Sequence, residues 1–216
     1  MNPKNNASGG AILSVRAYPI DPATEILVGQ VVKLAGGKVV PAAANESGPI
    51  LGIANESHQG KEDALNSRAN GEEILVADGP DMIFACPAPV VTATGGSTTT
   101  VVTTGLGDFT AEDLTGGHIQ LTKLAAGSTN VDGVGTTKAI ENFSGGTFTV
   151  PQGMGAAANG DQFAIYPPVG FAKGNLTASA LSLAAADALS LKVVGHDLGT
   201  KQIFLMAKKH VLGQGE

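Results

Sequence analysis

Short apolar runs alternate with Gly, Asn and Pro residues through the first part of the chain. Val31–Leu34 and Lys38–Val40 are two β-branched runs separated by Gly36-Gly37, a spacing that predicts a β-hairpin. Further strands are predicted at PILGIA, Glu73–Ala77 and Met82–Cys86. Turn-forming residues separate these runs, and many short strands at close spacing are typical of a small β-barrel or β-sandwich.

The tetrapeptide Ala-Asn-Glu-Ser occurs twice, starting at Ala44 and at Ala54, on either side of the apolar run GPILGI. One interpretation is a pair of turns around a buried strand, and the other is two copies of a ligand-binding loop. Asn tolerates the left-handed backbone region and Ser can cap a bend, so turn chemistry alone accounts for both copies. A duplicated ligand loop would need a donor or acceptor that an ordinary turn lacks, and we therefore favour turns.

Residues 90–168 have a different composition, which is rich in Thr and Gly. Strands are predicted at HIQLTKL, KAIENF, GTFTV and DQFAIYPP, with Gly-rich turns between them. TAEDL indicates a single helical turn, which Thr110 can cap while Glu112 and Asp113 lie at its positive end. This segment is therefore expected to form a second β-module.

The C-terminal tail contains two predicted strands, LSLKVV and QIFLMAKKHV, and a segment, Ala184–Leu191, that could form a short helix. We expect the tail to return to the first module. Residues 1–20 combine polar residues and Gly with Pro19, and Pro22 follows, so helix is disfavoured there. Such an extended arm is either disordered or ordered by pairing with a neighbour.

The expected fold is mainly β, with a small β-barrel or sandwich module, a second inserted β-module and an extended N-terminal arm. The expected domains are the arm at 1–24, the first module at 25–89 together with 169–216, and the second module at 90–168.

Composition and charge exclude several classes of function. Charged residues make up 15% of the chain, below the roughly 25% usual for soluble domains, and there are 30 Gly, which favours turn-rich β-structure over long amphipathic helices. The scarcity of aromatic residues, with seven Phe, two Tyr and no Trp, argues against a stacking platform that binds sugars or bases. The net charge of −6 without a Lys/Arg block argues against direct nucleic-acid binding. The N-terminal residues show no signal-peptide pattern, and no apolar run approaches the roughly 18 residues of a membrane span, so we expect a soluble chain made inside a cell, with no membrane partner.

The residues that usually carry chemistry are dispersed. Cys86, the single cysteine, lies among apolar residues and is interpreted as a core residue. Asp78 and Asp81 could hold a weak calcium ion, although a solvated turn is favoured because calcium loops collect more oxygen ligands. Neither the four histidines nor the adjacent carboxylate pairs have catalytic or metal-ligand spacing: His58, His118, His196, His210, Glu62-Asp63, Glu72-Glu73 and Glu112-Asp113.

Known sequence signatures of catalysis are absent as well. The chain has no phosphate loop and no nucleophile elbow, and GMGAAANG is followed by a predicted strand where a dinucleotide site needs a helix. We predict no catalytic, cofactor-binding or metal-binding residues, no cofactor and no enzymatic activity.

The segment VGQVVKLAGGKVVPAAANESGPILGIANES, followed by GEEILVADGPDMIFA, resembles the small β-barrel modules of tailed-bacteriophage head decoration (capsid cement) proteins. The resemblance covers roughly residues 25–87. The second module looks like β-modules of phage virion proteins, and the smallest decoration proteins have no such extra module.

The resemblance implies a structural virion protein on the outside of the capsid, made in the host cytoplasm. Its expected partners are the major capsid protein and its own copies, as a homotrimer, and its expected role is to clamp neighbouring capsomers against the pressure of packaged DNA. Two alternatives stay open. One is a receptor- or glycan-binding β-module, which would need exposed aromatic rings, and the sequence offers only Tyr18 and Tyr166. The other is an enzyme with an unfamiliar site.

Overall fold

The computed structural model describes residues 2–6, 14–59, 72–106, 108–151, 155–177 and 180–212. Strands account for 47% of the chain and helix for 2%, so the expected mainly β fold is confirmed. All pairings between the named strands are antiparallel: they are local meanders and hairpins with a few long-range partners. None of the sheets is closed into a barrel, so of the two expected forms the barrel is wrong and a sandwich-type module fits.

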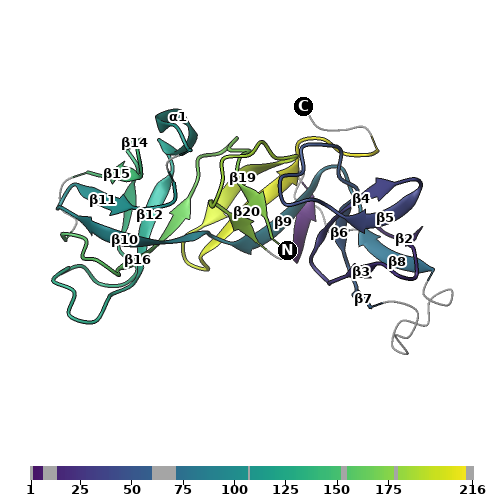
Figure 1. The fold of residues 1–216 in the computed structure, drawn as a ribbon, viewed down its shortest axis with the longest axis horizontal. Helices are drawn as coiled ribbons and strands as arrows, with labels where there is room; N and C mark the ends of the chain where they lie inside the picture. Colours follow the sequence, from purple (N-terminus) through teal and green to yellow (C-terminus); the bar gives the residue numbers. More distant parts are fainter. Residues whose placement is uncertain are drawn as a thin grey trace.

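The first module is a five-stranded sheet at one end of the molecule (Figure 1). Its strands, in spatial order, are β2 (Val15–Pro19), β8 (Glu73–Ala77), β6 (Gly52–Ala54), β4 (Val31–Ala35) and β5 (Lys38–Pro41). A bridge between Ile20 and Val39 brings the two edges of the sheet together at one point only. A smaller pair beside the sheet consists of β3 (Glu25–Ile26) and β7 (His58–Gln59).

The predicted hairpin joins β4 to β5. Gly36 and Gly37 have φ values of 58° and 80°, and two successive positive φ values define the tight turn that suits the twist of a two-residue hairpin. The local sequence rule was sufficient here because it needs no information from the rest of the chain.

The second module is a seven-stranded sheet at the opposite end of the molecule (Figure 1). Its order is β13 (Thr137–Ala139), β12 (His118–Lys123), β16 (Gln162–Tyr166), β10 (Val90–Gly96), β11 (Thr100–Thr103), β15 (Thr147–Thr149) and β14 (Asn142–Ser144). The predicted helical turn is α1 (Ala111–Leu114), where the Asp113 carboxylate accepts hydrogen bonds from the N–H and the hydroxyl of Thr110.

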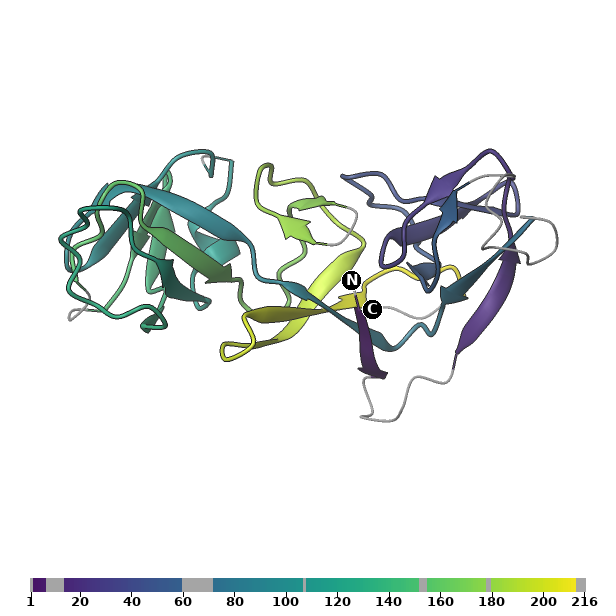
Figure 2. The same cartoon turned by 90° about the horizontal axis from the view of Figure 1, so that it is seen from below.

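A central sheet joins the two modules. Its order is β1 (Asn2–Asn6), β9 (Met82–Pro87), β20 (Gln202–Ala207) and β19 (Leu191–Asp197), with the small hairpin of β17 (Asn175–Leu176) and β18 (Leu181–Ser182) beside it. The tail therefore pairs with β9, which directly precedes the second module, and Figure 2 shows this sheet between the two ends. The domain boundaries expected from the sequence stay a prediction.

Two expectations about local structure need correction. The segment Ala184–Leu191 is not helical: it contains bends, a bridge at Ala188 and the first residue of β19. The expected arm at 1–24 includes β2, which pairs with β8 of the same chain along its whole length, so Val15–Pro19 belongs to the first module's sheet. β1 pairs with β9 of the same chain, with an irregular register.

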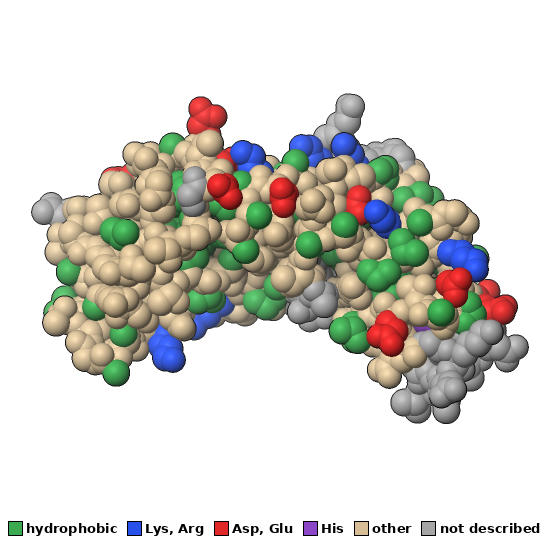
Figure 3. Space-filling view, in the orientation of Figure 1, with side chains coloured by type: hydrophobic (Ala, Val, Ile, Leu, Met, Phe, Trp, Pro, Cys, Tyr) green, Lys and Arg blue, Asp and Glu red, His purple; other side chains and the backbone are tan. Residues whose placement is uncertain are grey.

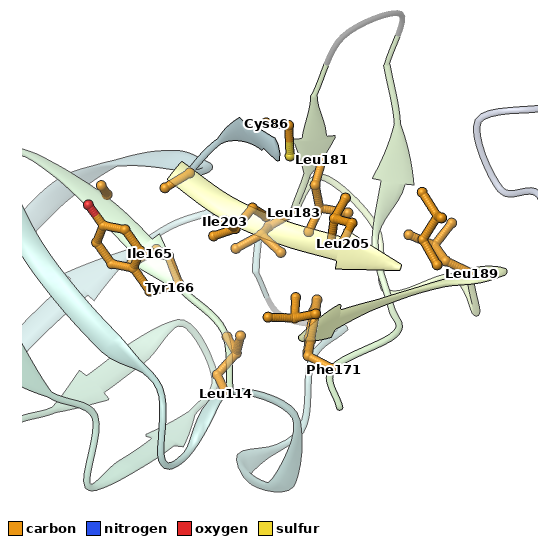
Figure 4. Packing of buried hydrophobic residues seen from close by; sticks show 14 of the residues in the cluster. Cys86, Leu114, Ile165, Tyr166, Phe171, Leu181, Leu183, Leu189, Ile203 and Leu205 are labelled. Carbon is orange, nitrogen blue, oxygen red and sulfur yellow. The ribbon is translucent and has the colours of Figure 1, made fainter. Parts of the chain in front are cut away.

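One cluster of buried apolar side chains reaches all three parts of the body, and the first module has a second, separate cluster: Ile20, Ile26, Val32, Val39, Leu51, Ala54, Ile74 and Val76. The larger cluster extends from Ile50 and Ile53 in the first module, through Phe84 and Leu205 in the central sheet, to Phe163 in the second module. Figure 4 shows its passage between the central sheet and the second module, where Leu183, Ile203, Ile165 and Tyr166 lie close together. Close-packed apolar contacts resist deformation, so the molecule is expected to behave as a stiff elongated body.

Candidate functional site

The first Ala-Asn-Glu-Ser copy lies where the first module meets the C-terminal part of the chain. Ala44 O accepts a hydrogen bond from Leu176 N at 2.7 Å, and Glu46 O accepts one from Ser190 N at 2.9 Å. Ile50 N donates to the carbonyl of Lys209 at 3.1 Å. Three separate tail segments thus dock on residues 43–51, which we call the coupling loop.

The Glu46 carboxylate holds the coupling loop in shape. It accepts hydrogen bonds from Lys33 Nζ at 2.6 Å, from Gly48 N at 3.0 Å and from Ala43 N at 3.3 Å, and the residue is buried. The hydrogen bond from Lys33 lowers the pKa of Glu46 below its ordinary value, and burial opposes this only in part. The charged form is therefore the one that the folded loop stabilises.

The second Ala-Asn-Glu-Ser copy binds a strand and a turn of its own module. Asn55 N donates to Leu75 O at 2.8 Å, and Glu56 Oε1 accepts from Leu75 N at 2.8 Å. Ser57 Oγ accepts from Val28 N at 3.0 Å. Both copies are bends whose polar atoms bind this chain's own backbone, so the prediction of turns is confirmed.

Asp78 fastens β2 to the module. The carboxylate is fully buried and accepts hydrogen bonds from the hydroxyls of Ser14 and Tyr18, while Arg16 Nε lies 3.3 Å away. These three residues alternate along the chain, so they present the same face of the strand to Asp78. Burial and the hydrogen bond to Asp78 raise the pKa of Tyr18 to about 12. Because its oxygens already bind these donors, Asp78 is a poor calcium ligand together with Asp81.

Asp161 organises a loop at the far end of the second module. Its fully buried carboxylate accepts hydrogen bonds from Ala125 N and Ala158 N, each at 2.9 Å, and from Ser128 Oγ at 3.1 Å. Burial alone would raise the pKa of Asp161, but these hydrogen bonds lower it below its usual value. The loop that they fix displays Val131, whose side chain is 89% exposed.

His118 and His196 meet at the joint between the second module and the central sheet. Their ring centroids are 5.1 Å apart, and the ring of Tyr166 lies 5.6 Å from that of His196. Burial and the proximity of His118 lower the pKa of His196. His118 lies in β12 and His196 lies in β19. The contact between His118 and His196 could not be predicted from their positions in the sequence, because the two residues are far apart in the chain.

The remaining candidates also serve the fold. Cys86 is buried, and burial raises the pKa of its thiol, which disfavours the nucleophilic thiolate. Asp113 forms an ion pair with Lys173 at 2.7 Å. His58 is fully buried in β7, with Nδ1 2.7 Å from Thr24 O. The pair Glu62-Asp63 lies outside the described residues.

Neither tyrosine presents a free ring for sugar stacking. Tyr166 is fully buried and donates to Gln120 Oε1 at 2.8 Å, and the hydroxyl of the half-buried Tyr18 is bound to Asp78. Among the described parts of the chain, no three His, Cys, Asp or Glu side chains are grouped so that they could hold a metal ion. No helix in those parts is long and apolar enough to cross a membrane.

Comparisons with models of protein families, with curated proteins and with solved structures find no match for this chain.

Proposed function

We propose that this chain is a structural virion protein, which binds the outer surface of a bacteriophage capsid and clamps neighbouring capsomers. Its partners are the major capsid protein and further copies of itself, as a homotrimer. It makes no direct contact with nucleic acid or membrane, has no cofactor and catalyses no reaction. The sequence resemblance of residues 25–87 to capsid cement proteins is the starting point, and the physical properties of the body support it.

The observation that carries the proposal is the apolar core that extends through all three parts of the elongated body (Figures 1 and 2). A clamp has to transmit force between two attachment points, and a body with a hinge between separate cores would yield first. The first module has a separate core of its own, but Ile50 and Ile53 belong to the cluster that continues to Phe163, and this shared packing across the joints opposes such a hinge. A stiff body also loses little conformational entropy when both ends are attached.

The distribution of polar groups supports a binding role over a chemical one. The buried carboxylates Glu46, Asp78 and Asp161 each bind donors of this chain. On the face shown in Figure 3, positive side chains are scattered among uncharged surface and do not form one patch. Such a surface suits contact with protein better than contact with a polyphosphate backbone.

Both ends of the body expose apolar side chains that can serve as contact points. In the first module, Leu27 and Val28 are 53% and 59% exposed, and in the second module Val131 and Val134 are 89% and 55% exposed. Single contacts of this size are weak, but several contacts in a trimer act together and raise the overall affinity.

The proposal is tested with capsids assembled with and without this chain. We expect capsids without it to rupture at a lower temperature, and added purified protein to restore the original rupture curve. In co-sedimentation, Val131→Asp should reduce occupancy, whereas Thr98→Asp, which places the same charge at another exposed position of the second module, should not. Identical rupture curves with and without the protein, or no sedimentation with capsids, would contradict the function.

The N-terminal segment needs a deletion that spares the first module. Removing residues 1–16 would take away Ser14 and Arg16, which bind Asp78, and would damage the sheet as well as any arm. Deletion of residues 2–13 keeps these contacts, although it also removes the edge strand β1 from the central sheet. If this segment contributes to attachment, the shortened protein remains folded by circular dichroism but leaves capsids; undiminished occupancy would remove the segment from the proposal.

A further inference from the structure

The C-terminal segment 208–212 is docked on the coupling loop by its backbone. Ile50 N donates to Lys209 O at 3.1 Å, and Val211 N donates to Ile50 O at 2.9 Å. These two bonds place His210 beside Ile50 in a parallel bridge. The segment follows β20 directly, so this short stretch attaches the central sheet to the first module.

The ring of His210 completes the attachment and is bound at both nitrogens. Nε2 lies 2.6 Å from the carbonyl oxygen of Leu51, and Nδ1 lies 3.0 Å from the backbone N–H of Leu212. A carbonyl can only accept and an amide N–H can only donate. The ring must therefore carry its proton on Nε2 and present a bare Nδ1, which is the neutral form.

A charged ring does not fit this arrangement. Protonation would place a hydrogen on Nδ1, facing the N–H of Leu212, so that two donors would oppose each other and one hydrogen bond would be lost. The residue is 6% exposed, so water cannot readily solvate the new charge. The geometry thus selects the neutral ring independently of any titration value.

The charged groups around the ring do not compensate for its burial. Asp78 favours the protonated ring, but its own charge is already paired with Arg16. Lys209, the next residue in the chain, directs its Nζ to Ser47 O at 3.2 Å. The net result is that burial lowers the pKa of His210 below its ordinary value of 6.5, although Leu51 O and Asp78 act in the opposite direction.

We propose that segment 208–212 is an acid-released latch, which holds the central sheet on the first module while His210 is neutral and opens when the ring takes up a proton. The inference does not depend on the proposed function. If the function is also correct, the latch would make the stiffness of the clamp depend on pH.

The direction of the pH dependence follows from proton linkage. The ring in the open state has the ordinary pKa of 6.5, and the ring in the docked state has a lower one. The open state therefore binds a proton more readily, so the latch is stable above about pH 6.5 and weakens as the pH falls toward the docked pKa. Between the two pKa values, the opening equilibrium rises by up to about tenfold per pH unit.

Backbone hydrogen exchange on the full chain, corrected for the intrinsic pH effect, measures the latch. Between pH 7.5 and pH 5, protection at Val211 N should fall at least several-fold, while Phe163 N in the second module keeps its protection. The His210→Gln variant keeps a side-chain N–H that can reach Leu51 O, but the glutamine side chain does not titrate. In this variant the protection of Val211 N should therefore be the same at both pH values. The control variant His58→Gln removes a different buried histidine. In this variant the protection of Val211 N should fall in acid as it does in the wild type.

A second measurement covers the case in which His210→Gln does not dock. Side-chain NMR of the wild-type protein should show the Nε2–H tautomer of His210 at pH 7.5 and an apparent pKa below 6.5. A pKa at or above 6.5, protection at Val211 that does not change with pH, or an equal loss at Val211 and Phe163 would overturn the latch. A loss confined to the latch, together with the lowered pKa, would support it even if the capsid experiments failed.

Discussion

The two Ala-Asn-Glu-Ser copies have the same sequence and different partners. The copy at Ala44 binds the backbone of Leu176 and Ser190, which are more than a hundred residues away in the chain. The copy at Ala54 binds Leu75 and Val28 within the first module. A turn sequence thus specifies the local bend, whereas its role in the molecule depends on which distant segment the fold brings against it.

Replacing the two glutamates should separate these roles most clearly. Glu46→Ala leaves Lys33 and two backbone N–H groups without their buried acceptor, and it should lower the free energy of unfolding by about 2–3 kcal/mol. Glu56→Ala removes the acceptor of Leu75 N at a less buried position and should cost about 1 kcal/mol. Urea unfolding of both variants measures the difference, and equal costs would contradict the comparison.

The contribution of Glu46 should also depend on pH. Its folded-state pKa is lowered from the ordinary value of 4.5, so its charge stabilises the fold above that pH, and this stabilisation is lost as the pH falls through the folded-state pKa. The stability difference between the wild type and Glu46→Gln should therefore be largest near pH 7 and shrink in acid. Lys33→Met removes the main cause of the shift and should show the same trend. A difference that is constant from pH 7 to pH 3 would disprove the assignment.

The smallest effect is expected at two serines: Ser190, which binds the coupling loop, and Ser57, which ends the second copy. The Ser190 hydroxyl is buried and donates to Gly48 O, so Ser190→Ala should cost about 1 kcal/mol, or roughly 2–4 °C in Tm for a chain of this size. Ser57→Ala removes an exposed acceptor of Val28 N and should cost about half as much. Thermal unfolding in parallel scans decides the order, and a larger loss for Ser57→Ala would reverse our interpretation.

Local rules explain which parts of the fold could be predicted. The hairpin at Gly36-Gly37 follows from backbone freedom alone, and the strand at Glu73–Ala77 follows from its apolar run. The segment Ala184–Leu191 has helix-forming residues, but its backbone binds distant partners: Leu189 N donates to Ala172 O and Ser190 N to Glu46 O. Tertiary contacts of this kind override propensity and leave no signal in a short window of sequence.

The candidate sites show the same limit. The sequence indicated that Cys86 is a core residue, because its neighbours are apolar. It could not reveal that Asp78 binds Ser14, Arg16 and Tyr18, or that His118 and His196 meet, because both arrangements join residues far apart in the chain. The role of His210 could not be predicted either, because the protonation of its ring is determined by hydrogen bonds to backbone groups of Leu51 and Leu212.

The second module departs from β9 and the chain then returns to β20, and these two strands are hydrogen-bonded neighbours in the central sheet. A protease that cut the loop between β12 and β13 would therefore produce two fragments that each retain one of the paired strands. The fragments would also share the β12–β16 pairing inside the second module. Such a nicked molecule should migrate as two pieces under denaturing conditions, yet remain one particle in solution.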